Sequence, residues 1–412
     1  MKRCIYCDFV SGIYDHKKAG AYIEALKKEM KLISPPLMGG DEGEGEKLST
    51  LFIGGGSPTA LSSDTLSILI NHIFTNFSFT EDYEATIEAN PRTVDKEKLQ
   101  AIRSLGINRI SIGVQSFNDD ELAFLGRIHS SDDAEQAVHL ARDAGFENIG
   151  IDLIYGIPGQ SIQSWKMTLE KAARLKPKHI STYELTVEKG TLLGEYLKNP
   201  PSFPFFKGGK SSSLLRWDYG GCSPLWQRGD RGDFPIKSNL PDEDKIIEMY
   251  EHTVDYLTSE GYIHYEISNF ALPGNQCRHN LNYWDRGEYY GVGLGAHSFI
   301  NAERFRNTDD LEKYLNLVSE NKSPVKESES ITEDMALSEA LFLGLRKTEG
   351  LNVESFSKRY KVNILSRHEK EIQGLQEAGL IEITNSGCSY ETSIKLTRRG
   401  LLLSNEVFTR LI

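Results

Sequence analysis

Two cysteines near the start of the chain, Cys4 and Cys7, stand three positions apart with Tyr6 just before the second. Thiolate ligands select zinc or iron–sulfur clusters, and a lone C-x-x-C pair also fits a redox dithiol. A closed zinc site needs four protein ligands. The sequence has no second C-x-x-C pair and no pair of histidines at zinc-finger spacing. A closed zinc site is therefore disfavoured, and an iron–sulfur ligand pair or a redox dithiol remains.

A glycine-rich segment, Gly54–Thr59, directly follows the apolar run Leu51–Ile53. Glycines at the end of a strand let the backbone approach a bound molecule closely. The alternative is a tight turn between a strand and a helix that binds nothing.

Short apolar runs alternate with helical patterns between residues 48 and 187. We predict strands at 51–53, 86–87, 110–114, 149–154 and 180–185, with helices at 61–76, 95–105, 131–145 and 161–175 between them. This alternation predicts an α/β fold with a parallel sheet. Polar and glycine residues gather at the carboxyl ends of these strands, which is where such folds place their active sites.

The rest of the chain lacks this alternation of strands and helices. Residues 35–48 read as a flexible loop, and residues 199–241 mix Pro, Gly, Ser and aromatic residues without a period. Helical periodicity returns at 242–260. Beyond 325 we predict helices at 333–347, 351–359 and 364–378 and a hairpin at 380–383 and 394–397, which suggests a winged helix. The expected domains are a barrel (1–198), an irregular insertion (199–241), barrel completion (242–324) and a winged-helix-like domain (325–412).

The composition narrows the function classes. The 412 residues carry a formal net charge of -12, whereas a nucleic-acid-binding protein needs a basic face. No apolar run approaches the roughly 18 residues of a membrane helix, and no signal peptide precedes the cysteines. Five scattered cysteines suit a reducing compartment better than a disulfide framework. We therefore expect a cytoplasmic protein that does not bind nucleic acid.

The two motifs together resemble the radical S-adenosylmethionine (SAM) superfamily. Its C-x3-C-x2-C motif holds three irons of a [4Fe-4S] cluster, and SAM chelates the fourth. Cys4 and Cys7 match the second and third cysteines, and Gly54–Pro58 matches the GGG-[ST]-P element. The resemblance implies a partial (β/α)6 TIM-like barrel without its first strand, followed by the winged-helix-like domain.

The resemblance is closest to the porphyrin-related branch of the superfamily, and it implies roles for individual residues. Cys4 and Cys7 would be metal ligands. Glu88 and Asp152 would accept hydrogen bonds from the ribose or the amino group of SAM, and Arg127 would clamp its carboxylate. The implied cofactor-binding set at the barrel mouth is Tyr6, Gly55, Gly56, Ser57, Glu88, Gln115, Arg127 and Asp152.

Two features separate heme chaperones from oxygen-independent coproporphyrinogen III oxidases within that branch. Phe9 stands where the oxidases have a further cysteine, and His279–Trp284 matches the H-N-x-x-Y-W motif of HemW-type heme chaperones. The resemblance implies that His279, Tyr283 and Trp284 bind heme. A neutral imidazole is a common heme ligand, although Cys277 is a rival. From the residues alone, a capped turn with Tyr and Trp in the core is an alternative.

The implied function is a heme chaperone that holds a SAM-liganded [4Fe-4S] cluster and passes heme to an acceptor protein of unknown identity. SAM and the cluster would gate heme transfer or dimerisation rather than drive catalysis. Two alternatives stay open: an oxygen-independent coproporphyrinogen III oxidase, which is an enzyme, and a truncated form that cannot hold its cluster. The resemblance is also compatible with transient membrane association and with a homodimer.

The first cysteine of the motif would fall one residue before Met1, which suggests a gene start placed too far downstream. We expect the chain as written to assemble its cluster poorly, because one iron lacks its thiolate. Anaerobic reconstitution with iron and sulfide, followed by iron counting, checks this expectation. About four irons per chain, the full complement of a [4Fe-4S] cluster, would contradict it.

Overall fold

A seven-stranded sheet forms the core of the computed structural model, which describes residues 4–10, 15–33, 47–198, 240–385 and 391–411. Five strands run parallel in chain order: β1 (Leu48–Ile53), β2 (Phe79–Ala89), β3 (Arg109–Gln115), β4 (Asn148–Tyr155) and β5 (His179–Glu184). The hairpin of β6 (Ile263–Glu266) and β7 (Asn269–Ala271) then adds antiparallel to β5. The expected α/β half-barrel is confirmed, and an antiparallel hairpin that the sequence did not predict completes it.

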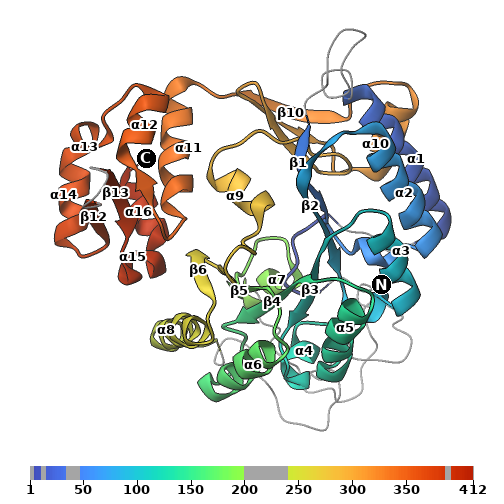
Figure 1. Ribbon diagram of the computed structural model, residues 1–412, viewed down its shortest axis with the longest axis horizontal. Helices are drawn as coiled ribbons and strands as arrows, with labels where there is room; N and C mark the ends of the chain where they lie inside the picture. The colour runs from blue at the N-terminus through green and yellow to red at the C-terminus, as the bar shows by residue number, and fades with distance from the viewer. Residues whose placement is uncertain (1–3, 11–14, 34–46, 199–239, 386–390, 412) are drawn as a thin grey trace, which may run out of the picture.

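Helices cover the outer face of this sheet (Figure 1). They are α1 (His16–Ile33), α2 (Ser63–Asn76), α3 (Lys96–Ser104), α4 (Asp119–Phe124), α5 (Ser131–Asp143), α6 (Ile162–Arg174) and α8 (Glu243–Ser259), with short 3-10 turns η1 (Pro58–Ala60) and η2 (Pro91–Thr93). Helix α7 (Leu192–Lys198) lies instead beside the segment of Cys4 and Cys7, where the N–H of Leu193 donates to Ile5. Side chains of Ser62, Asp95, Ser130 and Ser161 cap helices by accepting from backbone N–H groups in the first turn. The helices that were predicted here, α2, α3, α5, α6 and α8, begin within two residues of their predicted starts.

Alternation along the strands divides the sheet into an apolar outer face and a polar inner face. Ala85 and Ile87 of β2 are fully buried in the core beneath the helices. Successive side chains of a strand point to opposite faces, so Glu84, Thr86 and Glu88 point into the barrel lumen. This polar lumen positions the candidate site.

Beyond β7 the chain forms helix α9 (Arg278–Trp284) and a small antiparallel sheet of β8 (His297–Ile300), β9 (Glu303–Asn307) and β10 (Val325–Ser330), with α10 (Leu311–Ser319). In Figure 1, α9 lies between the barrel strand β1 and the C-terminal module. Helix α10 packs beside α1, as both the picture and the contacts show. Neither the small sheet nor a helix at α9 was predicted from the sequence.

The C-terminal module consists of α11 (Glu333–Leu345), β11 (Leu351–Asn352), α12 (Val353–Tyr360), α13 (Ile364–Arg367), α14 (Glu369–Glu377), β12 (Ile381–Asn385), β13 (Thr392–Leu396), α15 (Arg398–Leu402) and α16 (Ser404–Leu411). Its three strands form an antiparallel sheet in the order β11-β13-β12. Helices followed by a hairpin give the expected winged-helix-like arrangement.

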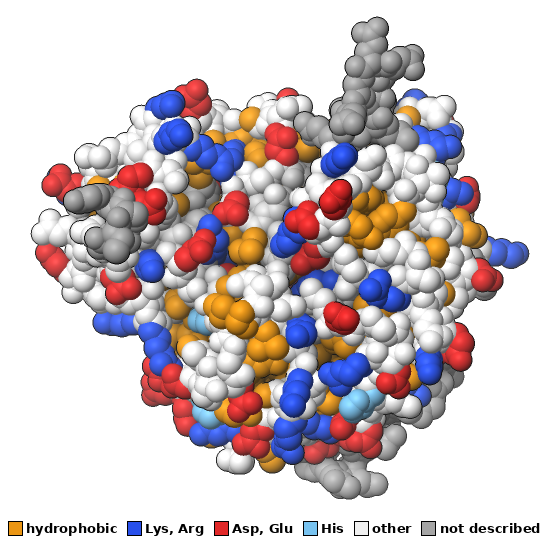
Figure 2. All heavy atoms as spheres, in the orientation of Figure 1, with side chains coloured by type: hydrophobic (Ala, Val, Ile, Leu, Met, Phe, Trp, Pro, Cys, Tyr) orange, Lys and Arg blue, Asp and Glu red, His pale blue; other side chains and the backbone are white. Residues whose placement is uncertain are grey.

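Some sequence expectations lie outside the described residues: most of the predicted loop at 35–48, most of the insertion at 199–241, and Cys222 and Cys388. Figure 2 shows acidic and basic side chains interspersed over the face in view, without a continuous basic band. In the described part of the chain, no helix is both long and apolar enough to cross a membrane.

Candidate functional site

The cysteine segment lies at the barrel mouth, held there by backbone hydrogen bonds. Ile5 donates its N–H to the carbonyl oxygen of Leu125 at 3.3 Å and accepts from the N–H of Leu193 at 2.9 Å. The N–H of Cys7 donates to the carbonyl oxygen of Cys4 at 3.3 Å, which closes a turn with both thiols partly exposed. Tyr6 lies within this turn, and burial raises the pKa of its hydroxyl. The two thiols therefore share one fixed segment.

Two carboxylates face each other across the upper lumen, Glu88 at the end of β2 and Asp152 in β4. The N–H of Gly55 donates to Glu88 Oε2 at 3.2 Å. Asp152 accepts from the Ser111 hydroxyl, with 3.2 Å to each of its oxygens. Burial, together with the Asp152 charge, raises the pKa of Glu88 to about 7. Burial also raises the pKa of Asp152. Such a pair favours a ligand that brings positive charge or hydroxyl donors.

Arg127 joins the cysteine turn to the strand ends. Its Nη2 donates to the carbonyl oxygen of Gly113 at 2.6 Å, and its Nη1 lies 3.5 Å from Cys4 Sγ. Its Nε is buried, and no described residue supplies an acceptor for it. Gln115 ends β3 in the left-handed region at φ 68°, which turns the chain beside the same rim.

The glycine-rich turn leaves open space beside these groups. Gly55 and Gly56 adopt φ of 81° and 125°, and a Cβ built on either would meet nothing within 4 Å. Gly54 differs, because a Cβ there would lie 2.9 Å from the Glu88 carboxyl carbon. Ser57 begins η1 without a side-chain hydrogen bond in its capping position. The turn therefore fits the close approach of a ligand to Glu88.

These residues fit a cluster and SAM only in part. Two adjacent thiols suit two irons, and the open glycine turn with its carboxylates suits an amino acid and a ribose. Among the described residues, no group of three or more His, Cys, Asp or Glu side chains is arranged to hold a metal ion. The structure brings Cys4, Tyr6 and Gln115 close to Arg127. It also places Glu88 beside Gly55 and within the influence of Asp152.

The predicted heme motif forms helix α9, whose first turn is anchored by Glu84 of β2. Glu84 accepts the backbone N–H of Arg278 at 3.2 Å and that of His279 at 3.1 Å. The Cys277 thiol also points to this carboxylate, with 3.6 Å between Sγ and Oε1. A carboxylate at a helix N-terminus satisfies orphan donors and complements the helix dipole. Glu84, which the sequence analysis did not single out, therefore fixes the motif helix to the barrel.

The His279 ring is held between side chains of strand β1 and its own helix. Its Nδ1 lies 2.9 Å from the Thr50 hydroxyl, and its Nε2 lies 3.0 Å from the Tyr283 hydroxyl. Its ring stacks on Phe52 with 5.1 Å between centroids. Burial lowers the pKa of His279 to about 4, so its imidazole is neutral at neutral pH. A neutral imidazole oriented by a hydrogen bond at one nitrogen is the form that binds metals.

The polar residues around His279 differ in how accessible they are to a bound molecule. Cys277 is only 1 % exposed, and burial raises the pKa of its thiol to about 11. Arg278 pairs instead with Asp82, at 3.1 Å to the carboxylate. Below α9, the buried Arg109 donates to the Thr86 hydroxyl at 3.3 Å. The partly exposed His279 is therefore more accessible to a bound molecule than the buried Cys277.

Trp284 lies apart from His279 and Tyr283. Positions 279 and 283 are one helical turn apart and share a face, and their rings meet at 4.9 Å. Trp284 is covered instead by the Arg346 guanidinium, 4.3 Å from its ring. The structure therefore brings two of the three predicted heme residues together and places the third against the C-terminal module.

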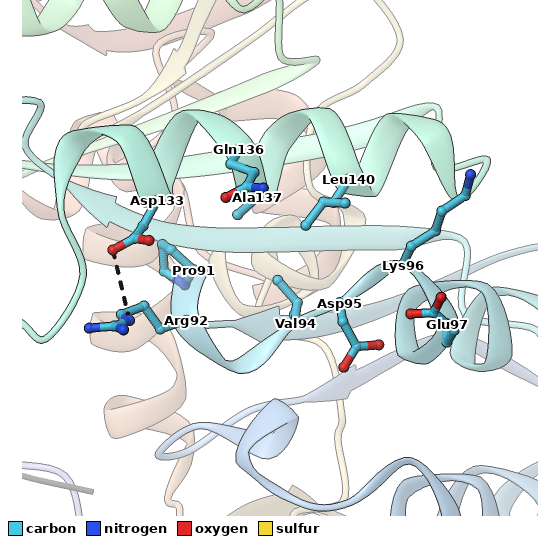
Figure 3. Close-up of a pocket in the computed structure, with 10 residues that line it drawn as sticks. All are labelled: Pro91, Arg92, Val94, Asp95, Lys96, Glu97, Asp133, Gln136, Ala137 and Leu140. Carbon is cyan, nitrogen blue, oxygen red and sulfur yellow. Dashed lines mark ion pairs between the residues drawn. The ribbon is translucent and has the colours of Figure 1, made fainter.

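A separate surface pocket of about 400 Å³ lies outside the barrel, between η2, the start of α3, and α5 (Figure 3). Figure 3 shows Arg92 and Asp133 at one end, joined by an ion pair of 3.8 Å. Its lining shares no residue with the barrel mouth or with α9. We therefore do not assign the site chemistry to this pocket.

Two protein-family matches coincide with the barrel and with the C-terminal module. Residues 1–172 match the Radical SAM superfamily, and residues 331–403 match the HemN C-terminal domain. The chain is 34% identical over 406 residues to a protein named heme chaperone HemW from Bacillus subtilis, covering 98% of this chain and 94% of that protein. The protein of the same name from Lactococcus lactis is also 34% identical, over 411 residues, covering 99% of this chain and 94% of its own.

Among solved structures, coproporphyrinogen III oxidase (HemN) from Escherichia coli, described as a radical SAM enzyme, matches 100% of this chain and 87% of its own. The TM-score is 0.78 at 22% sequence identity. This likeness shows a shared fold.

We expect Glu84→Ala to destabilise the protein by about 3 kcal/mol, because the change removes the cap of α9 and one of the two carboxylates whose charge acts on the buried Arg109. Urea unfolding followed by circular dichroism measures the effect. Glu81→Ala is the control, since Glu81 is exposed on the same strand and should change stability by less than about 0.5 kcal/mol. Equal unfolding midpoints for the two variants would show that Glu84 does not anchor the helix.

Proposed function

Because the chain belongs to the HemW family of the radical SAM superfamily, we propose that it binds heme on helix α9 and passes it to an acceptor protein. The observation that carries this proposal is the placement of His279 as a neutral imidazole, with Tyr283 at its Nε2. A heme iron takes such a nitrogen as an axial ligand. Tyr283 and the partly exposed rings around it offer flat apolar surface with polar tips.

Heme binding at Nε2 requires the Tyr283 hydroxyl to move, since both would use the same lone pair. The Thr50 hydroxyl can keep its bond to Nδ1 and so hold the ring in the tautomer that leaves Nε2 free for iron. The buried thiol of Cys277 is protonated at neutral pH and faces Glu84, which supports a structural role for it. This arrangement favours reversible heme binding, as a carrier needs.

The barrel mouth is proposed to hold the other two cofactors of the superfamily. Cys4 and Cys7 would bind two irons of a [4Fe-4S] cluster, and a bound cluster with SAM would supply an open iron and a sulfonium group. Glu88 and Asp152 would accept hydrogen bonds from SAM, and Arg127 would receive its carboxylate near Gly113. The polar lumen between this mouth and α9 supports gating of heme transfer by these cofactors rather than catalysis by them.

We expect His279→Ala to weaken hemin binding at least tenfold, because the iron loses its axial nitrogen. Tyr283→Phe should strengthen binding by about two- to tenfold, because it removes a competing hydrogen bond worth roughly 0.5–1.5 kcal/mol. Titration of the Soret band under anoxia measures both effects.

Cys277→Ala serves as the matched control for these two variants, and it should keep hemin affinity within about twofold, since the thiol is not a ligand in this account. Unchanged affinity in His279→Ala would remove that residue from the site. Conversion of coproporphyrinogen III to decarboxylated product, with SAM and a reductant, would contradict the carrier function.

The affinity for SAM should rise several-fold between about pH 6 and pH 7.5. The pKa of Glu88 is raised to about 7, so its carboxylate is mostly protonated below that pH and accepts hydrogen bonds poorly. Above it the ionised carboxylate attracts the cationic ligand. Isothermal titration of the anaerobically reconstituted protein measures this trend, and Glu88→Gln should flatten it. A wild-type affinity that is independent of pH would show that Glu88 does not contact SAM.

A further inference from the structure

A ladder of aromatic rings leads away from the proposed heme ligand. It starts at Phe52 and His279 in the lumen and continues to Tyr283, whose ring meets Tyr289 edge-on at 4.7 Å. Tyr289 then faces Phe299 of β8 at 6.5 Å, and backbone hydrogen bonds of 2.9 Å in both directions join these two residues. Apart from Phe299, these side chains are partly exposed. The ladder therefore offers an apolar wall that continues the His279 face.

Two arginines close the far end of this ladder. The guanidinium of Arg286 lies over the Phe299 ring at 4.6 Å, and that of Arg304 lies 6.0 Å from the same ring. Both pair with one carboxylate, Glu339 of α11, at 2.9 Å and 2.6 Å. Arg304 also reaches Glu329 at 3.4 Å, but Glu329 is half exposed, where a pair contributes little. The two guanidiniums therefore share one buried carboxylate, Glu339, and Arg304 has a second, exposed partner in Glu329.

Arg286 has donor capacity that the protein does not use. Its side chain is 10% exposed, and its Nη2 finds no acceptor among the residues that the structure describes. A buried donor without a partner costs about 1–3 kcal/mol, more when it is charged. Arg304, which pairs with the same Glu339, is 36% exposed and can meet a ligand from the solvent. An anionic group that entered from the solvent side would satisfy the open donor and balance the charge.

We propose that Arg286 and Arg304 bind the carboxylates of the tetrapyrrole whose iron His279 holds. The proposal rests on the proposed function and assigns specificity within it. Heme carries its two propionates along one edge of an otherwise apolar ring, and the ladder places an apolar wall beside the iron ligand with guanidiniums beyond it. Guanidinium–carboxylate pairs are charge-assisted and frequently bidentate.

The alternative is a purely structural role, in which Glu339 joins β9 to α11 by pairing with the arginines. That role accounts for the hydrogen bonds that the Nε of Arg286 and the Nη2 of Arg304 donate to Glu339. It leaves the buried Nη2 of Arg286 unexplained, and it does not require the aromatic ladder. The two roles also make different predictions for a ligand without carboxylates.

Ferric protoporphyrin IX has free carboxylates and its dimethyl ester has none, so comparing their affinities for the unmutated protein distinguishes the two roles. In the same dilute detergent, we expect the full-length protein to bind the free acid at least about tenfold more tightly than the ester. Arg286→Gln and Arg304→Gln should each reduce this preference and leave ester affinity unchanged. Arg92→Gln, on the outer surface, should keep it. Circular dichroism confirms that each variant is folded.

Each outcome of this titration decides between claims. Equal wild-type affinity for acid and ester, with binding intact, would overturn the carboxylate site and leave the heme-binding proposal standing. A wild-type preference that both arginine variants retain would also overturn it, because other groups would then bind the propionates. Binding of neither porphyrin would overturn the proposed function itself.

Discussion

One buried carboxylate, Glu84, joins the barrel to the helix that carries the proposed ligand. It accepts two backbone N–H groups and faces a thiol at the start of α9, and it comes from the middle of a central strand. A buried carboxylate in this position is tolerated because it accepts hydrogen bonds from these donors and the charge of Arg109 acts on it. Without this anchor, the start of α9 would depend on the Arg278–Asp82 pair and the contacts of His279 with Thr50 and Phe52, which would hold the imidazole less firmly.

The same lumen contains the groups that face the proposed cofactors, and their charges act on one another. Burial opposes the charge of Arg109, but Cys277, Glu84 and other neighbours outweigh it and raise the pKa of its guanidinium. Asp152 lies within the influence of the same guanidinium and, with Glu88, forms the acidic pair at the mouth. A change of charge at the mouth therefore reaches the floor of the lumen through buried groups that water screens poorly. This gives a physical basis for coupling between the two proposed sites.

The sequence predicted the parallel half-barrel well because its local signals agree. The apolar runs, the glycine turns and the Ser or Asp caps all indicate the same boundaries. The acidic mouth was also predictable, since Glu88 and Asp152 follow from strand ends and from the family resemblance. The small sheet at β8–β10 was missed because its strands are short and its last strand is almost wholly exposed, so no apolar alternation marks it.

Glu84, Arg109 and the arginine pair were missed for another reason. The alternation Glu84, Thr86, Glu88 in β2 is visible in the sequence and would have indicated a polar lumen if the strand had been predicted at its full length. The pairing of Arg286 with Arg304 through Glu339 depends on three separate elements, and no local pattern reports such a contact. Local sequence therefore predicts the frame, whereas tertiary contacts decide which charges meet.

The central claim is that α9, held by Glu84, presents a neutral His279 to heme iron. Pulsed electron paramagnetic resonance of the ferric heme complex, made with protein labelled at histidine with ¹⁵N, tests it most directly. The account predicts coupling of the iron to one labelled imidazole nitrogen, and loss of that coupling in His279→Ala. A thiolate-type signal from Cys277, or a labelled coupling that survives in the variant, would contradict it.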